Sequence, residues 1–241
     1  MDYFWIILII VVASLVKGIT GFGFAMVSLP LLLFWYSPKV VIPVLILCNF
    51  FASLMIVLQK KEYKLINRHF KSLIIYGGCT TILGVLTLRF ISSNILILSI
   101  SIFFIIVSIL YLFNIKYSRT VRKYTYKIAG AVCGFLTGSI SVCGPPLALF
   151  LNLRQANNRQ FREIFAWFNI ITAAIAIFGY ALSGLLTMET IKLSLLFIPI
   201  LLLGTFFGKK VNALIPAKRF RRITVIMSLI SSIFLLINCR S

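Results

Sequence analysis

Hydrophobic residues fall into ten stretches along the chain, separated by short polar segments. The stretches are 3–16, 22–36, 40–58, 72–88, 90–115, 128–139, 145–153, 164–182, 191–208 and 223–238. A helix that crosses a bilayer needs about 20 apolar residues, with about 17 as the lower limit. The first two stretches are shorter than this, and so are the sixth and seventh. Each of these pairs is therefore either one interrupted helix or a hairpin of two short helices that returns to its own side.

Glycine and proline interrupt the apolar pattern at 17–24 and again at 134–146. Glycine adopts backbone angles that other residues avoid, and proline lacks an amide donor. Within a bilayer such a break is tolerated only where protein or a water-filled cavity satisfies the freed backbone groups. Paired breaks in the two halves of a membrane protein indicate a transport site near the midplane.

Composition supports a membrane protein with many spans. The chain has 241 residues, of which 61% are hydrophobic and 12% charged, and its mean hydropathy is +1.08. Soluble domains contain about 25% charged residues. The net charge of +20 does not indicate nucleic acid, because the charges lie between hydrophobic spans. There they fit cytoplasmic loops that contact anionic lipid.

Charge also predicts the topology. Most basic residues lie in four loops, 59–71, 115–127, 154–163 and 209–222. If every broken segment crossed once, two of these loops would lie on each side, contrary to the positive-inside rule. A hairpin at 128–153 instead places all four loops in the cytoplasm, and a second hairpin at 3–36 would place both termini outside. We predict that hairpin and extend it by symmetry to the first pair, for which a single broken span stays open.

The two halves of the chain align with each other. The matched pairs are Pro30 with Pro145, Asn49 with Asn169, and Gly84 with Gly208, at offsets of 115, 120 and 124. We interpret the growing offset as short loop insertions. The pattern predicts an all-α polytopic membrane protein with two inverted repeats, each a broken-helix hairpin plus three transmembrane helices. The first repeat is 1–115, a cytoplasmic basic linker is 116–127, and the second repeat is 128–241.

The breaks carry the candidate binding residues. They supply hydroxyls and backbone amides from Thr20, Gly21, Gly23, Thr137, Gly138, Ser141, Gly144 and Pro145. Helix N-termini bind anions through unpaired N–H groups and the helix dipole. We therefore expect both breaks to aim amides at one small oxyanion in the interior. The alternative is that they are kinks needed only for packing.

Three further residues complete the candidate site. Lys17 lies beside the first break, where a cation is either functional or snorkels to an interface. Its repeat counterpart is expected at Val132 or Cys133, so the charge occurs once. Asn49 and Asn169 are matched amides within spans, and they either donate to the substrate or bridge helices.

Other features narrow the chemistry. The spacings of Gly130, Gly134 and Gly138, and of Gly204 and Gly208, are typical of close helix packing. The four acidic residues lie near span ends or in loops, and His69 is the only histidine. The five cysteines show no CxxC spacing and are interpreted as small buried hydrophobes. We expect no catalytic residues, no metal and no cofactor.

The sequence resembles the TauE/SafE sulfite exporter family. The resemblance rests on Gly18-x-x-Gly21-x-Gly23 with Pro30, on Gly134-x-x-x-Gly138 leading to Gly144-Pro145-Pro146, and on the repeat of the two halves. It implies export of sulfite, an organosulfonate or a related sulfur-containing anion across the cell membrane. Lys17 matches no family motif.

We therefore expect a secondary transporter whose partners are a small anion and anionic lipid, and not nucleic acid. A homo-oligomer stays open. One alternative is a membrane subunit that anchors a partner and moves no solute. Another is a membrane-embedded enzyme acting on lipid-linked substrates, for which Glu163 would be the one acid among Arg154, Arg159 and Arg162.

Overall fold

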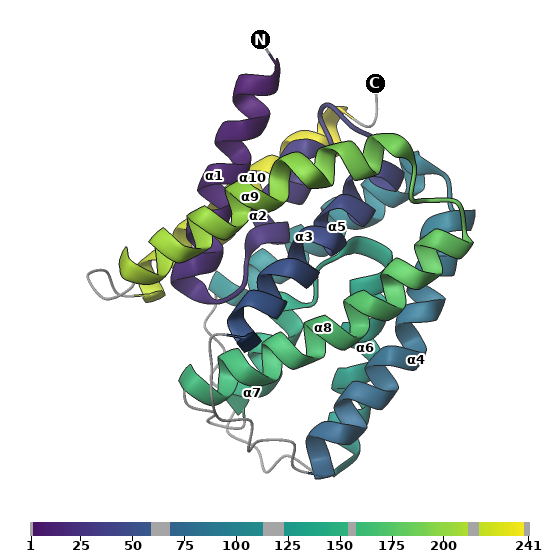
Figure 1. Cartoon of the computed structure of the whole chain (residues 1–241), viewed down its shortest axis with the longest axis vertical. Coiled ribbons are helices and arrows are strands. Elements are labelled where there is room, and N and C mark those ends of the chain that lie inside the picture. The colour runs from purple at the N-terminus through teal and green to yellow at the C-terminus, as the bar shows by residue number, and fades with distance from the viewer. Residues whose placement is uncertain (1, 59–67, 113–122, 154–157, 212–216, 239–241) are drawn as a thin grey trace. The chain divides into compact units, whose positions relative to one another are not determined.

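The computed structural model describes residues 2–58, 68–112, 123–153, 158–211 and 217–238, and these form ten helices (Figure 1). The helices are α1 (Asp2–Thr20), α2 (Phe24–Leu32), α3 (Pro38–Leu58), α4 (Arg68–Phe90), α5 (Ser93–Leu112), α6 (Lys123–Ile140), α7 (Gly144–Leu153), α8 (Asn158–Leu182), α9 (Met188–Val211) and α10 (Ala217–Asn238). Each predicted apolar stretch is a helix, so the all-α polytopic prediction is confirmed.

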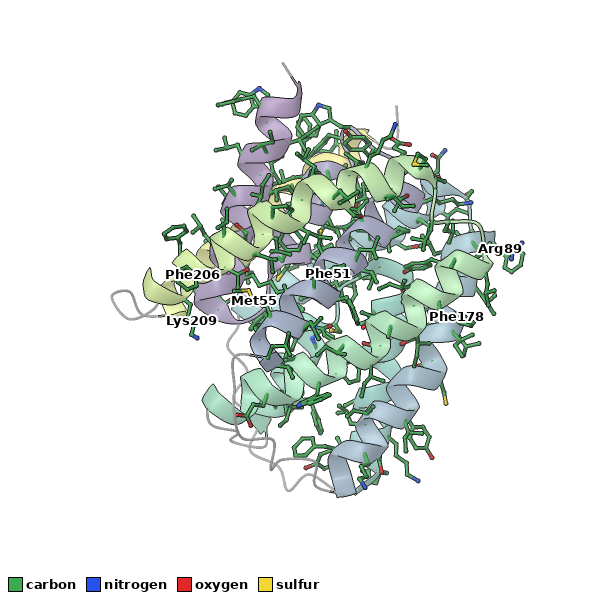
Figure 2. All side chains as sticks on the ribbon, viewed as in Figure 1. Phe51, Met55, Arg89, Phe178, Phe206 and Lys209 are labelled. Carbon is green, nitrogen blue, oxygen red and sulfur yellow. The ribbon has the colours of Figure 1, made fainter. Side chains whose placement is uncertain are left out.

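Four helices in the described part are long and apolar enough to cross a membrane: Pro38–Leu58, Phe70–Phe90, Glu163–Leu182 and Met188–Lys209. Their outward faces carry large apolar side chains. Phe178 of α8 is 67% exposed and Phe206 of α9 is 45% exposed, and Figure 2 shows both pointing away from the ribbon. Such surfaces suit lipid, because hydrocarbon replaces water as their solvent.

The helices form two compact units. The first unit contains Met1–Cys48, Ile91–Ile115 and Thr187–Ser241, and the second contains Asn49–Phe90 and Lys116–Leu186. Each unit therefore takes helices from both halves of the chain, and α3 is divided between them after Cys48. The division of the sequence into two repeats with a basic linker stays a prediction.

In the second unit, α4 and α6 pack closely with their chains running in the same direction. A Cβ added to Gly130 would meet the carbonyl of Leu73, one on Gly134 that of Gly77, and one on Gly138 that of Thr81. The numbering rises on both helices, so they are parallel. Only glycine permits this approach of two backbones. The Thr81 hydroxyl seals the crossing by donating to Gly134 O at 3.1 Å.

The helices α6 and α7 form the predicted hairpin. Tyr126 lies near the start of α6 and Phe150 near the end of α7, yet their ring centroids are 4.9 Å apart. Phe70, near the start of α4, packs on the same Tyr126 ring at 5.7 Å. The chain thus turns at the break and returns toward the end from which α6 started. The side of the membrane to which this hairpin returns stays a prediction.

In the first unit, α1 and α9 repeat the packing of α6 and α4. A Cβ on Gly18 would lie 2.5 Å from Thr205 O, and one on Gly208 would lie 2.5 Å from Leu15 O. In the second unit, Gly138 meets Thr81 O and Gly84 meets Phe135 O in the same arrangement. The first helices correspond at an offset of 120 and their partners at 124, so the two crossings use equivalent positions.

The short helix α2 contains a proline, and the backbone hydrogen bond that this proline removes is replaced by one from another helix. Pro30 has no N–H, so it cannot donate to Met26 O four residues earlier. The Ser228 hydroxyl of α10 donates to Met26 O instead, at 2.7 Å. Figure 1 shows the chain turning back between α1 and α2, and these helices pack against each other. The helices of the first pair therefore also fold back on each other, and the membrane hairpin at 3–36 stays a prediction.

The breaks correct the alignment of Pro30 with Pro145. The first helices end at Thr20 and Ile140 and the second ones begin at Phe24 and Gly144, a constant offset of 120. Pro30 lies within α2, whereas Pro145 is the second residue of α7. The two prolines are therefore not equivalent, and the counterpart of Lys17 is Thr137 rather than Val132 or Cys133. The offset grows only after the helix that carries Asn49 or Asn169.

Candidate functional site

The first break is built by two left-handed glycines. Gly21 has φ 83° and its N–H donates to Lys17 O at 2.8 Å, which ends α1. Gly23, at the N-cap of α2, has φ 105° and no side chain with which to cap the helix. The first-turn amides of α2, from Phe24 to Met26, therefore have no side-chain cap at that position. Amides in this position are suited to bind an anion.

Lys17 places a positive charge at this break. Its side chain is 1% exposed, and Nζ lies 5.8 Å from the centroid of the Phe24 ring, at the first residue of α2. A snorkelling lysine would expose its ammonium group, so the burial favours the functional interpretation. The position in the last turn of α1 is also favourable, because a cation there opposes the negative end of the helix dipole.

Two hydroxyls that were predicted to bind substrate donate instead to carbonyls of their own helices. Thr20 Oγ1 donates to Val16 O at 2.8 Å, lies against Phe22 O and accepts from Phe22 N. Thr137 Oγ1 donates to Cys133 O at 2.7 Å. Each proton is therefore engaged within its own segment. Both side chains are buried beside the breaks, where they hold the ends of α1 and α6.

The second break has the same turn built from different residues. Ser141 has φ 60°, the one positive value of a non-glycine residue in the described ranges, and its N–H donates to Thr137 O at 3.0 Å. After it, α7 begins at Gly144 and continues with Pro145 and Pro146. Prolines carry no N–H, and Leu147 N already donates to Cys143 O. Of the first four residues of α7, this leaves Gly144 to offer an amide.

The matched asparagines both lie against this second break. Asn49 Nδ2 donates to Ser141 Oγ at 3.5 Å, and Cys143 Sγ donates to Asn169 Oδ1 at 3.2 Å. The two amides are 9% and 5% exposed. Both asparagines therefore contact residues of the second break, within the second unit. That they flank a substrate stays a prediction. Neutral donors, rather than a cluster of helix amides, dominate the chemistry of this break.

Gly138 has mainly a packing position. It lies at the crossing of α6 with α4, and its carbonyl accepts a hydrogen bond from Tyr180 Oη at 2.6 Å. Gly144 and Pro145 are buried at the start of α7. Cys143 is the residue that the sequence interpretation did not include. Its position between Ser141 and Gly144 was the available signal.

Comparison with curated proteins and with solved structures gives no significant match. A family model does match. It is described as sulfite exporter TauE/SafE, and it covers residues 6–235, which include both helix breaks and nearly the whole chain. The four helices that are long and apolar enough to cross a membrane agree with a multi-pass membrane protein. This chain belongs to the sulfite exporter TauE/SafE family.

Proposed function

We propose that this protein exports a small sulfur-containing oxyanion, which is sulfite, an organosulfonate or a related anion, across the cell membrane, and that its two helix breaks line the path. The substrate would contact Lys17, Gly21 and Gly23 with the adjacent α2 amides at the first break. At the second it would contact Ser141, Gly144, Asn49 and Asn169, with Thr20, Thr137, Gly138 and Pro145 shaping the turns. The observation that carries the proposal is the buried charge of Lys17.

An ionisable residue buried within a membrane protein is by default a functional-site hypothesis. Lys17 is 1% exposed and lies next to the start of α2. The positive end of the α2 dipole adds to the positive potential at this point. A passing anion would therefore be stabilised here by two sources, the ammonium group and the amides that follow Gly23. This supports an anion as the cargo rather than a cation or a neutral solute.

The second break supports recognition of oxygen atoms without a full charge. Its buried side chains are amide, hydroxyl and thiol groups from Asn49, Asn169, Ser141 and Cys143. Neutral hydrogen-bond donors hold an anion more weakly than an ion pair does. A site that must release its substrate benefits from this weaker hold.

The membrane potential is sufficient to drive export. Moving one negative charge outward gains about 2.3 kcal/mol per 100 mV when the cytoplasm is negative. Glu163 and Glu189, the acidic residues whose side chains the structure describes, lie near the ends of α8 and α9. No buried carboxylate relay is needed for this mechanism, and uniport of the anion satisfies it.

We also propose that the basic loops are cytoplasmic, where they contact anionic lipid, and that both termini are external. Seven of the basic loop residues lie outside the described ranges: Lys60, Lys61, Lys64, Lys116, Arg119, Arg122 and Arg154. Lys71 and Lys127 are described, are exposed, and lie near the starts of the parallel helices α4 and α6. They therefore mark the same end of the second unit, as one cytoplasmic surface requires.

Flux measured in proteoliposomes tests this function. The purified protein would be reconstituted with an inside-negative potential, and efflux of sulfite, sulfate, thiosulfate, taurine and sulfoacetate would be compared with empty vesicles. We expect saturable, potential-dependent efflux of at least one of the first three anions or sulfoacetate. A ligand that binds the native state should also raise the melting temperature. A protein that melts cooperatively but moves none of these solutes would contradict the proposal and favour a membrane subunit without transport.

A further inference from the structure

Cys143 occupies a position at which its side chain cannot cap its own helix. It directly precedes Gly144, the first residue of α7, and its carbonyl accepts from Leu147 N at 3.1 Å. An N-cap side chain normally accepts from the amides two or three residues later. Here those two residues are Pro145 and Pro146, and neither has an N–H. The Cys143 thiol is therefore released from capping and can act on another element.

The element it acts on is α8. Cys143 Sγ lies 3.2 Å from Asn169 Oδ1, and the two side chains are 4% and 5% exposed. A thiol is a weak donor. This buried contact nevertheless favours the orientation in which Oδ1 of the Asn169 amide faces Cys143. With Oδ1 held by the thiol, the Nδ2 group of Asn169 is the end that remains to donate.

The repeat-related Asn49 is held by its opposite end. Its Nδ2 group donates to Ser141 Oγ at 3.5 Å. An oxyanion accepts hydrogen bonds and does not donate them, so it needs an amide whose Nδ2 is available. Of the two matched asparagines, Asn49 already uses one of its two Nδ2 protons on Ser141, whereas Asn169 is held by its oxygen. Asn49 and Asn169 are therefore equivalent in sequence but differ in which end of the amide the protein holds.

We infer that Cys143 is a positioning residue for the substrate, whose thiol orients Asn169 so that Nδ2 donates to an oxygen of the bound oxyanion. The inference rests on the proposed export of such an anion and deepens it, because it identifies Asn169 as the principal amide donor of the second break. Cys143 acts through Asn169 and does not itself contact the substrate.

The test uses ³⁵S-sulfite efflux from proteoliposomes containing the full chain, with KM and maximal rate measured separately. We expect Cys143→Ala to raise KM about fivefold, the equivalent of about 1 kcal/mol for one lost hydrogen bond, with little change in maximal rate. Cys143→Ser keeps a donor and should restore KM to within about twofold of the wild type. The control is Cys79→Ser, because Cys79 is exposed on α4, and it should leave both constants unchanged.

A double-mutant cycle separates positioning from packing. Asn169→Leu removes the amide at similar volume, and we expect it to raise KM more than Cys143→Ala does. If the thiol acts only through Asn169, the double variant should have the KM of Asn169→Leu alone. Melting temperatures of all variants show whether each protein is folded. Fully additive effects, or an unchanged KM in a folded Cys143→Ala protein, would overturn the inference.

The same experiment distinguishes failure of the positioning role of Cys143 from failure of the proposed export function. Sulfite efflux by the wild type that is insensitive to Cys143→Ala would overturn the positioning role and leave the export function standing. A folded wild type that moves none of the anions of the panel would overturn the export function, and the positioning role would fall with it.

Discussion

Gly21 and Ser141 occupy the same place in the two helix breaks and share a left-handed backbone, with φ of 83° and 60°. Each N–H donates to the carbonyl four residues earlier, that of Lys17 or Thr137. The two hairpins thus turn by the same local mechanism, although one uses glycine and the other serine. Only the serine adds a side chain to its break, and that side chain contacts Asn49.

The left-handed backbone angle at Gly21 should determine which substitutions are tolerated there. Gly21→Asn is expected to be tolerated, because asparagine adopts this conformation with little strain, whereas Gly21→Val should destabilise the protein by about 1–2 kcal/mol or more. Thermal unfolding in detergent measures both. Equal melting temperatures for the two variants would show that the backbone angle is not the determinant.

The crossing of α4 and α6 should not accept a methyl group. A Cβ on Gly134 would collide with the backbone carbonyl of Gly77, which cannot move aside within a helix. We expect Gly134→Ala to lower stability by about 1–3 kcal/mol. The matched control is Gly78→Ala on α4, whose Cβ would meet only the flexible end of Ile175 at 2.8 Å. A larger loss for the Gly78 variant would refute this account of the crossing.

The Tyr180 hydroxyl should stabilise the end of α6. It donates to Gly138 O, a carbonyl in the last turn of α6, where helical partners are missing. Tyr180→Phe is expected to cost about 1 kcal/mol of unfolding free energy, because it leaves that buried carbonyl unpaired. Tyr76→Phe provides the comparison, since Tyr76 is 41% exposed and should be neutral. Chemical unfolding in mixed micelles would report the difference.

Substitution of Lys17 should reduce efflux without lowering the melting temperature. Lys17→Met keeps the length of the side chain and removes the buried charge. We expect sulfite efflux to fall at least about tenfold, a change of about 1.4 kcal/mol, while the melting temperature stays level or rises. Lys71→Met, at an exposed position near the start of α4, should retain efflux. Normal efflux by the Lys17 variant would remove the main support for an anion path at the first break.

The sequence was sufficient to predict each helix that the structure describes, because apolar stretches flanked by polar residues have one stable form in a bilayer. It also predicted that α6 and α7 fold back on each other, since a single crossing would divide the basic loops between the two sides, contrary to the positive-inside rule. The pairing of Asn49 with Asn169 located two amides that reach the second break. These inferences depend on composition and charge, which act over whole segments and tolerate errors of a few residues.

The remaining features depend on single atoms brought together by tertiary packing. Pro30 and Pro145 align in sequence, but Pro30 lies inside α2 and Pro145 lies at the start of α7. Thr20 and Thr137 appeared available as donors, yet both protons are used by nearby carbonyls. Cys143 appeared to be a small buried hydrophobe, because its neighbour Asn169 follows 26 residues later. No local pattern encodes such contacts.

The hydrogen bond from Ser228 to Met26 has a consequence for biogenesis. Met26 emerges from the ribosome some 200 residues before the serine that satisfies its carbonyl, and α9, which packs on α1, is also made late. The second unit, in contrast, consists of residues 49–90 and 116–186 and can be complete while translation continues. The N-terminal hairpin is therefore the first part to be inserted and the last to be finished.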